Sequence, residues 1–342
     1  MSRSHIPVEI ITNILSCLPV KPLVRFLYVS KQWYAVITSS HFIKMHLNRS
    51  IETNRERTLI LKEDNLLPPT HYFSVDFPKD NQFSKAVEIY QPLHDPLYNW
   101  NILDHCHGLV CLEKDDEEVL IWNPLIRKYR KLPIEPIEEP SGFLGETYSV
   151  LAFGHDPYNN DYKVLRLIHF DTGDKVEFVV KVYSLRSESW KKIEEQWPNN
   201  KQIYTRKSTS LNGAIHYLEV LGGYICVIVK DNCTCKSNDV WLMKDYGVES
   251  SWTQIYKIEQ DVMPWTVEDF KPLMFSNNGK KVLLMEGQYA HKNFFWYDIE
   301  KKNCKVVKNR SFPKSFRLKT CIGSLLLLHG DNEERGKNDG VS

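Results

Sequence analysis

Two short runs of the sequence contain residue types that could bind a metal or perform redox chemistry. His105, Cys106 and His107 are adjacent, and in a strand the two histidines would share a face, but no distant pair of ligands completes a four-ligand site. Cys233 and Cys235 are one residue apart, which is not the spacing of a redox pair. Strand packing and a polar loop are the simpler explanations, so we expect no metal and no cofactor.

The motifs of common enzymes are also missing from the sequence. It has no phosphate-binding glycine loop, no Gly-x-Ser-x-Gly and no His-Glu-x-x-His. The acidic run 115–118 is interpreted as a solvated hairpin turn, with an acidic docking spot as the alternative. The sequence therefore predicts a protein without catalytic residues of its own.

Composition and charge narrow the class of protein further. Of 342 residues, 42% are hydrophobic and 25% are charged, a mix typical of soluble globular domains. Lys plus Arg number 44 and Asp plus Glu number 43, a balance that argues against a dedicated nucleic-acid binder. No apolar run approaches the roughly 18 residues that cross a bilayer, so we expect no membrane insertion.

Cysteine usage gives an expectation for the cellular compartment. The eight cysteines are scattered and lack the spacing of a disulfide framework. The first residues, 1–5, contain no apolar signal core. Reduced thiols in the cytoplasm, the nucleus or both are the simplest interpretation.

The first fifty residues have the period of short helices. Ile11, Ile14, Leu15 and Leu18 recur at i, i+3, i+4 and i+7, which makes one apolar stripe. The segment carries six basic side chains and one acidic one. About 45 residues are near the lower limit for independent folding, so the apolar surface must be covered either by a partner or by the downstream chain. Periodicity alone leaves both alternatives open.

The order of these residues resembles a known motif. The matching positions are 6–11, 14–15, 18–25, 29–33 and 37. With two Pro-anchored helix edges, a leucine-rich helix and a Val-Ser-Lys-x-Trp segment, the region resembles an F-box over about residues 5–47. The resemblance implies binding to the small Skp-type adaptor that connects F-box proteins to a cullin scaffold and its RING subunit. By the same resemblance, the residues at or just behind the adaptor interface are Pro7, Ile10, Leu15, Leu18, Pro19, Leu23, Val24 and Trp33.

Beyond about residue 55 the sequence takes the period of strands, with turn residues every eight to twelve positions. Four segments share the form of an apolar strand, a polar turn and a second strand; they begin at Val119, Val180, Val240 and Phe294. Each is preceded by another strand pair, and four strands per repeat is the content of a propeller blade. We therefore expect an all-β domain, a β-propeller of about six blades, with two packed sheets as the competing architecture. The last run, 324–328, is expected to close the ring.

Several motifs of this half resemble a second family. They lie at 106–111, 121–124 (which contains Trp122-Asn123-Pro124), 130–133, 153–157 with 161–164, 182–185 with 189–190, and 211–216. In this order they resemble the plant F-box-associated domain, which is kelch-like, over about residues 59–328. The resemblance implies recruitment of a protein for ubiquitination. Relatives of this kind include S-locus F-box proteins and F-box regulators of immunity.

These observations predict three regions: an adaptor-binding helical module at 1–50, a recognition domain at 55–329 and a disordered tail at 330–342. The predicted function is the substrate-recognition subunit of a Skp–cullin–F-box ubiquitin ligase, with an unknown protein substrate. The alternatives are an F-box scaffold acting outside the ligase and a propeller enzyme.

Most tryptophans occupy repeated strand positions, so Trp100, Trp197 and Trp265 are the candidates for substrate contact.

Overall fold

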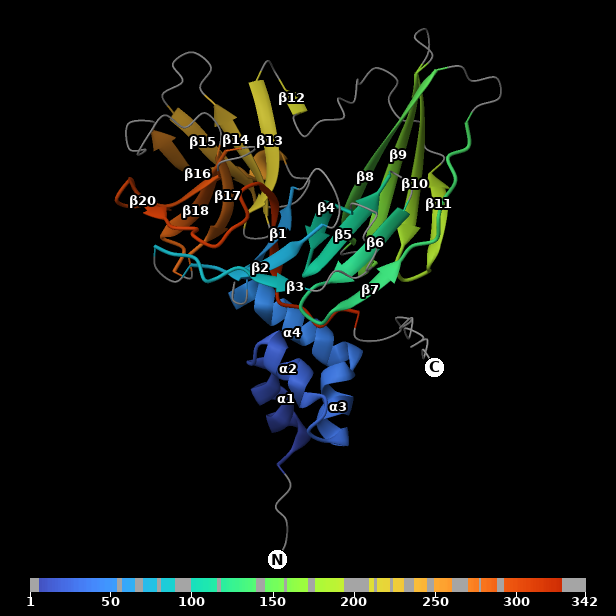
Figure 1. Ribbon diagram of the computed structural model, residues 1–342, viewed down its shortest axis with the longest axis vertical. Helices are drawn as coiled ribbons and strands as arrows, with labels where there is room; N and C mark the ends of the chain where they lie inside the picture. The colour runs from blue at the N-terminus through green and yellow to red at the C-terminus, as the bar shows by residue number, and fades with distance from the viewer. Residues whose placement is uncertain are drawn as a thin grey trace, which may run out of the picture.

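Four short helices form the N-terminal part of the computed structural model (Figure 1). They are α1 (Val8–Ser16), α2 (Val20–Phe26), α3 (Lys31–Thr38) and α4 (Ser40–Thr53). The structure describes residues 6–53, 57–64, 70–78, 81–89, 100–115, 118–139, 145–156, 159–171, 176–193, 209–211, 214–221, 224–230, 237–244, 249–259, 270–276, 278–287 and 292–327.

Prolines and serines define where the helices begin. Pro7 and Pro19 occupy the N-cap positions of α1 and α2. Ser30 caps α3, because its hydroxyl accepts a hydrogen bond from the backbone N–H of Trp33 at 3.1 Å. Ser39 does the same for Phe42 at the start of α4, at 3.2 Å. The second helix begins at Val20, two residues before Pro22.

The rest of the described chain forms five antiparallel sheets, which we call blades 1 to 5 (Figure 1). Blade 1 contains β21 (Phe316–Ile322), β1 (Arg57–Glu63), β2 (Tyr72–Asp76) and β3 (Val87–Ile89). Blade 2 contains β4 (Asn101–Cys106), β5 (Leu109–Lys114), β6 (Glu118–Asn123) and β7 (Lys128–Lys131). Blade 3 contains β8 (Glu146–Asp156), β9 (Asp161–Asp171), β10 (Val176–Ser184) and β11 (Ser189–Ile193).

The last two blades follow the same plan. Blade 4 contains β12 (Thr209–Leu211), β13 (Ala214–Leu221), β14 (Tyr224–Lys230), β15 (Ser237–Met243) and β16 (Trp252–Glu259), with a short 3-10 helix η1 (Glu249–Ser251) before β16. Blade 5 contains β17 (Phe270–Phe275), β18 (Lys281–Glu286), β19 (Asn293–Asp298) and β20 (Asn303–Val307).

The sequence repeat coincides with one hairpin of each blade. The four segments predicted from Val119, Val180, Val240 and Phe294 are the hairpins β6–β7, β10–β11, β15–β16 and β19–β20. Each is preceded by the expected second hairpin of the same sheet. The repeated blade architecture is therefore confirmed.

The two ends of the β domain meet in blade 1, but not through the segment expected from the sequence. Strand β21 pairs along its whole length with β1, from Arg57 opposite Ile322 to Glu63 opposite Phe316. The expectation that 324–328 is the closing strand is wrong, because Leu325 is packed against the helices instead. The described residues contain five sheets rather than about six, since the early strands and the last one share a single blade.

Apolar side chains between neighbouring blades form the core. Separate clusters join blades 1 and 2, blades 2 and 3, blades 4 and 5, and blades 5 and 1. Strands β5, β6 and β18 are buried on both faces because a blade packs on each side of them. In the part of the chain that the structure describes, no helix is long and apolar enough to cross a membrane.

Candidate adaptor-docking surface

The helical module exposes an unusual amount of apolar surface. Twelve large hydrophobic side chains of the described residues are exposed, and seven of them lie between residues 6 and 34. They are Ile6, Val8, Ile10, Ile14, Tyr28, Val29 and Tyr34. Exposed large apolar side chains concentrated in one short segment indicate a protein interface. We call these seven residues the apolar docking surface.

Helix α1 is apolar on two sides, which explains how it contributes to this surface. Leu15 is 1% exposed and packs in the core of the module. Ile10 and Ile14, one turn apart, are 49% and 56% exposed and face solvent. The single stripe expected from the sequence is therefore wrong for Ile14, which belongs to the outer face. A helix with a second apolar face needs a second partner besides its own core.

The predicted interface residues divide into three layers of burial. Pro7, Ile10 and Pro19 are exposed. Leu18, Val24 and Trp33 are half-buried, and the Trp33 ring contacts the Phe26 ring edge-on at 5.1 Å between centroids. Leu15 and Leu23 are buried in the module's core, so they support the surface from behind.

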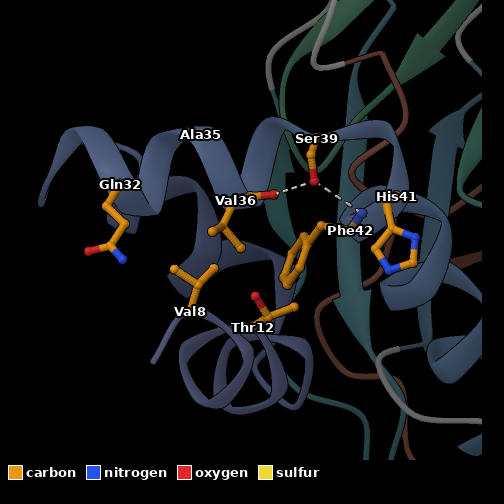
Figure 2. A pocket seen from close by; sticks show the side chains of 8 residues that line it. All are labelled: Val8, Thr12, Gln32, Ala35, Val36, Ser39, His41 and Phe42. Carbon is orange, nitrogen blue, oxygen red and sulfur yellow. Dashed lines mark hydrogen bonds between the residues drawn. The ribbon is translucent and has the colours of Figure 1, made fainter. Parts of the chain in front are cut away.

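A groove indents the module between α1 and α3 (Figure 2). Its volume is about 390 Å³, and Val8, Ala35, Val36 and Phe42 provide its apolar lining. The hydroxyl of Ser39 donates to the carbonyl oxygen of Val36 at 2.8 Å, which holds the α3–α4 corner at one end of the groove. The groove can receive one protruding apolar side chain of a partner.

The helical module also carries exposed basic side chains. Lys21, Arg25, Lys31 and Lys44 are exposed, and within the described residues none of them forms an ion pair. Unpaired surface cations attract an acidic partner and accelerate its association at low salt. The module therefore combines exposed apolar side chains with exposed cations, a combination that can bind an acidic protein.

Sequence reasoning missed several members of this surface. Tyr28, which is 88% exposed, lies in the turn between α2 and α3, and Tyr34 lies on α3. The available signal was the pair Tyr28-Val29 immediately before Ser30, where a solvent-exposed turn would ordinarily be polar.

The tryptophans proposed for substrate contact receive no support. Trp100 is 3% exposed and packs between blades 1 and 2, with its carbonyl oxygen accepting a hydrogen bond from the Tyr72 hydroxyl at 2.7 Å. The expectation for Trp100 is wrong, because its large apolar ring is buried in the core between two blades and is not accessible to a substrate. Trp197 and Trp265 lie outside the described residues.

The histidines at 105 and 107 point to different partners. Strand β4 ends at Cys106, and His107 lies in the following turn with φ of 49°. The His105 ring contacts the Thr320 hydroxyl at 3.1 Å, and the His107 ring contacts the Tyr162 hydroxyl at 3.0 Å. Burial, with His155 nearby, lowers the pKa of His107 to about 4. Both rings are part of the packing around β4.

The acidic run at 115–118 contributes an ion-pair network in its described part. Glu118 is bonded to Lys131 and to Lys114, at 3.1 Å in the second case. These bonds, the one from Lys131 first, lower the pKa of Glu118. A carboxylate paired with two lysines offers little net charge to a docking partner.

Two family models match the chain in the regions described above. A model described as "F-box domain" matches residues 4–45, and one described as "F-box associated beta propeller domain" matches residues 70–220. Together they cover more than half of the sequence. The apolar docking surface therefore lies within the matched F-box region.

Similar proteins share both regions. The chain is 26% identical to F-box protein CPR1 of Arabidopsis thaliana, over 94% of this chain and 89% of that protein. It is 25% identical to F-box protein At4g22390 of the same plant, over 94% and 90%. It is 26% identical to F-box/kelch-repeat protein At3g23880, also of Arabidopsis thaliana, over 83% and 86%. The chain belongs to the plant F-box proteins that carry an F-box-associated domain.

The comparison with solved structures is weaker. An oligogalacturonate lyase in complex with manganese is similar at a TM-score of 0.38 and 10% identity, over 69% of this chain and 70% of that chain. No conclusion about this protein rests on that similarity.

Proposed function

We propose that this protein is the substrate-recognition subunit of a Skp–cullin–F-box ubiquitin ligase. The observation that carries the proposal is the apolar docking surface, seven exposed hydrophobic side chains within the segment that matches the F-box model. In this assembly the helices bind the Skp-type adaptor, and the adaptor brings the cullin and the RING subunit. The subunit itself is not an enzyme, and ubiquitin transfer is performed by the other components. It acts in the cytoplasm, the nucleus or both.

The β domain supplies the second binding function. Its blades bury their apolar residues between one another, so the domain is a stable platform whose loops can recognise a target protein. The proposed division of labour is therefore adaptor binding by the helices and substrate binding by the blades.

Adaptor binding is tested with one charged substitution and a matched control. Ile10 and Val306 have nearly equal exposure, 49% and 47%, but Val306 lies on β20 in blade 5. We expect Ile10→Asp to weaken the adaptor affinity of the full chain at least tenfold, about 1.4 kcal/mol, measured by isothermal titration calorimetry. Val306→Asp should bind like the unchanged protein. Equal binding by Ile10→Asp would remove the basis of the proposal.

The alternative is an F-box scaffold that acts outside the ligase. Affinity purification of the full chain from plant cells distinguishes the two roles. Adaptor together with cullin in the purified complex supports the ligase subunit, whereas adaptor without cullin supports the scaffold.

Proximity labelling with the Ile10→Asp chain, which should bind targets without delivering them to the ligase, would then identify the substrate.

A further inference from the structure

The hydrophobic core of the helical module contains residues from the far end of the chain. Leu325 is completely buried and packs in one cluster with Leu15, Leu23, Ile37 and Phe42 of the helices. Ile126, from the turn between β6 and β7, belongs to the same cluster. The module's core is therefore completed by the β domain.

One buried side chain holds this C-terminal segment in place. Asn123, at the end of β6, is 0% exposed, and its amide nitrogen donates to the carbonyl oxygens of Ser324 at 2.9 Å and Leu326 at 3.0 Å. Its side-chain oxygen accepts from the backbone N–H of Leu125 at 3.2 Å. The two donated bonds fall on either side of Leu325 and fix its backbone. The Trp122-Asn123-Pro124 motif thus connects blade 2 to the end of the chain.

The turn between β4 and β5 lies directly against the same segment. Gly108 has a φ of +85°, and a Cβ atom there would lie 2.4 Å from the carbonyl oxygen of Ile322 and 2.5 Å from the Cβ of Ser324. Only glycine satisfies both the backbone conformation and this close approach. Leu326 and Leu327 then contact the cluster between blades 2 and 3 as well as the helical module.

The segment 323–327 therefore touches the helices, blade 2 and the junction of blades 2 and 3 at once. It directly follows β21, which pairs with β1, the first strand after α4. The helical module is thus attached at both ends of the β domain and along the β6–β7 turn. Rotation of the module would expose Leu325 and Ile126 to water, which is unfavourable. The Asn123 hydrogen bonds hold the segment on blade 2, so it cannot simply follow the module.

We propose that Asn123, Gly108 and Leu325 are positioning residues that lock the F-box in one orientation relative to the β domain. Their consequence for activity rests on the proposed function: they fix the direction in which a substrate bound to the blades faces the ligase. The segment 323–327 thereby belongs to the adaptor-binding unit, although it is nearly 280 residues away from the F-box in the sequence.

The test measures orientation in the full chain by single-molecule energy transfer between bioorthogonal labels at Lys21 and Lys192, which are exposed on α2 and β11. We expect one narrow distribution for the unchanged protein, and a distribution shifted or broadened roughly twofold for Gly108→Ala and Leu325→Ala. Asn123→Ala removes all three hydrogen bonds of this side chain without a clash, and it keeps the test valid if Gly108→Ala does not fold.

Two controls separate positioning from general damage. Gly279 also has a positive φ, +70°, but a Cβ atom there meets nothing within 4 Å, so Gly279→Ala carries the backbone strain without the clash. Leu283→Ala removes an equally buried leucine from blade 5. Both controls should keep the narrow distribution. An unchanged distribution in the Gly108, Asn123 and Leu325 variants, or an equal change in the controls, would overturn the inference.

The readout does not depend on the adaptor. If the unchanged protein shows one orientation but binds no adaptor, the proposed function fails and the inference about positioning stands. If the unchanged protein binds the adaptor but the positioning variants keep the native distribution, the inference about positioning fails and the proposed function stands.

Discussion

The helical module and the β domain solve the problem of burying apolar side chains in different ways. In the β domain, apolar clusters between neighbouring blades leave Leu120, Trp122 and Leu283 completely inaccessible. The helical module has four short helices and borrows Leu325 and Ile126 from the β domain, yet seven large apolar residues stay exposed. The difference indicates that the blades cover their own apolar residues, whereas the helices leave an apolar surface for a partner protein to cover.

The largest effect is expected from a core aromatic residue of the blades. Trp122 is fully buried between blades 1 and 2 and contacts Tyr72 edge-on at 5.5 Å. Trp122→Ala should lower the free energy of unfolding by about 3–5 kcal/mol, because it leaves a cavity that neighbouring strands cannot fill. Urea unfolding of the full chain measures the loss. A loss below about 1 kcal/mol would show that the blades do not share a tightly packed core.

The β domain buries several cations, and Lys62 is one of them. Lys62 is 2% exposed, its ammonium donates to the Asn101 side chain at 2.9 Å, and burial lowers its pKa from 10.5 to about 8. The unfolded chain binds more protons between these values, so the Lys62 contribution to stability should rise with pH from about 8 to 10.5, by up to about 3 kcal/mol.

Comparison with Lys62→Met isolates this contribution from other titrating groups. The stability difference between the unchanged protein and the variant should shift in favour of the unchanged protein as pH increases through that range. Thermal unfolding at a series of pH values gives the difference at each point. A difference that is constant with pH contradicts a depressed pKa at Lys62.

Two adjacent residues of α1 distinguish the core of the helical module from its docking surface. Leu15 is 1% exposed and Ile14 is 56% exposed on α1. Leu15→Ala should cost about 2–5 kcal/mol of stability, whereas Ile14→Ala should change stability by less than about 0.5 kcal/mol. Ile14→Ala should instead weaken adaptor binding, by roughly 1 kcal/mol. Calorimetric melting and adaptor titration of both variants check the pair, and a large stability loss for Ile14→Ala would place it in the core.

The smallest effect is expected at a helix cap. Ser30→Ala removes the acceptor for the backbone N–H of Trp33 and should destabilise α3 by about 1 kcal/mol. Ser30→Asp keeps an acceptor and should restore most of the loss. If adaptor is present at saturating concentration, the apparent loss should remain, because the cap lies in the folded module whether or not the partner is bound.

Local rules predicted much of this fold. The caps at Ser30 and Ser39 follow a local rule, because a side-chain oxygen satisfies a nearby backbone N–H whatever the tertiary context. The repeated segments beginning at Val119 and Val180 identified hairpins, because strand alternation and turn residues are also properties of neighbouring positions in the sequence. Burial was harder to predict, since Ile14 and Leu15 have nearly equal hydrophobicity and differ only in which side of α1 meets the other helices.

The sequence by itself determined the class of protein, the helical module followed by repeated strand pairs, and the absence of recognised catalytic motifs. These follow from residue order and short-range periodicity. Only the tertiary structure decided that β21 closes blade 1, that Trp100 is a core residue, and that Leu325 completes the core of the F-box. Such contacts join residues hundreds of positions apart, and their energy depends on which surfaces meet in space, which no local pattern of residue types specifies.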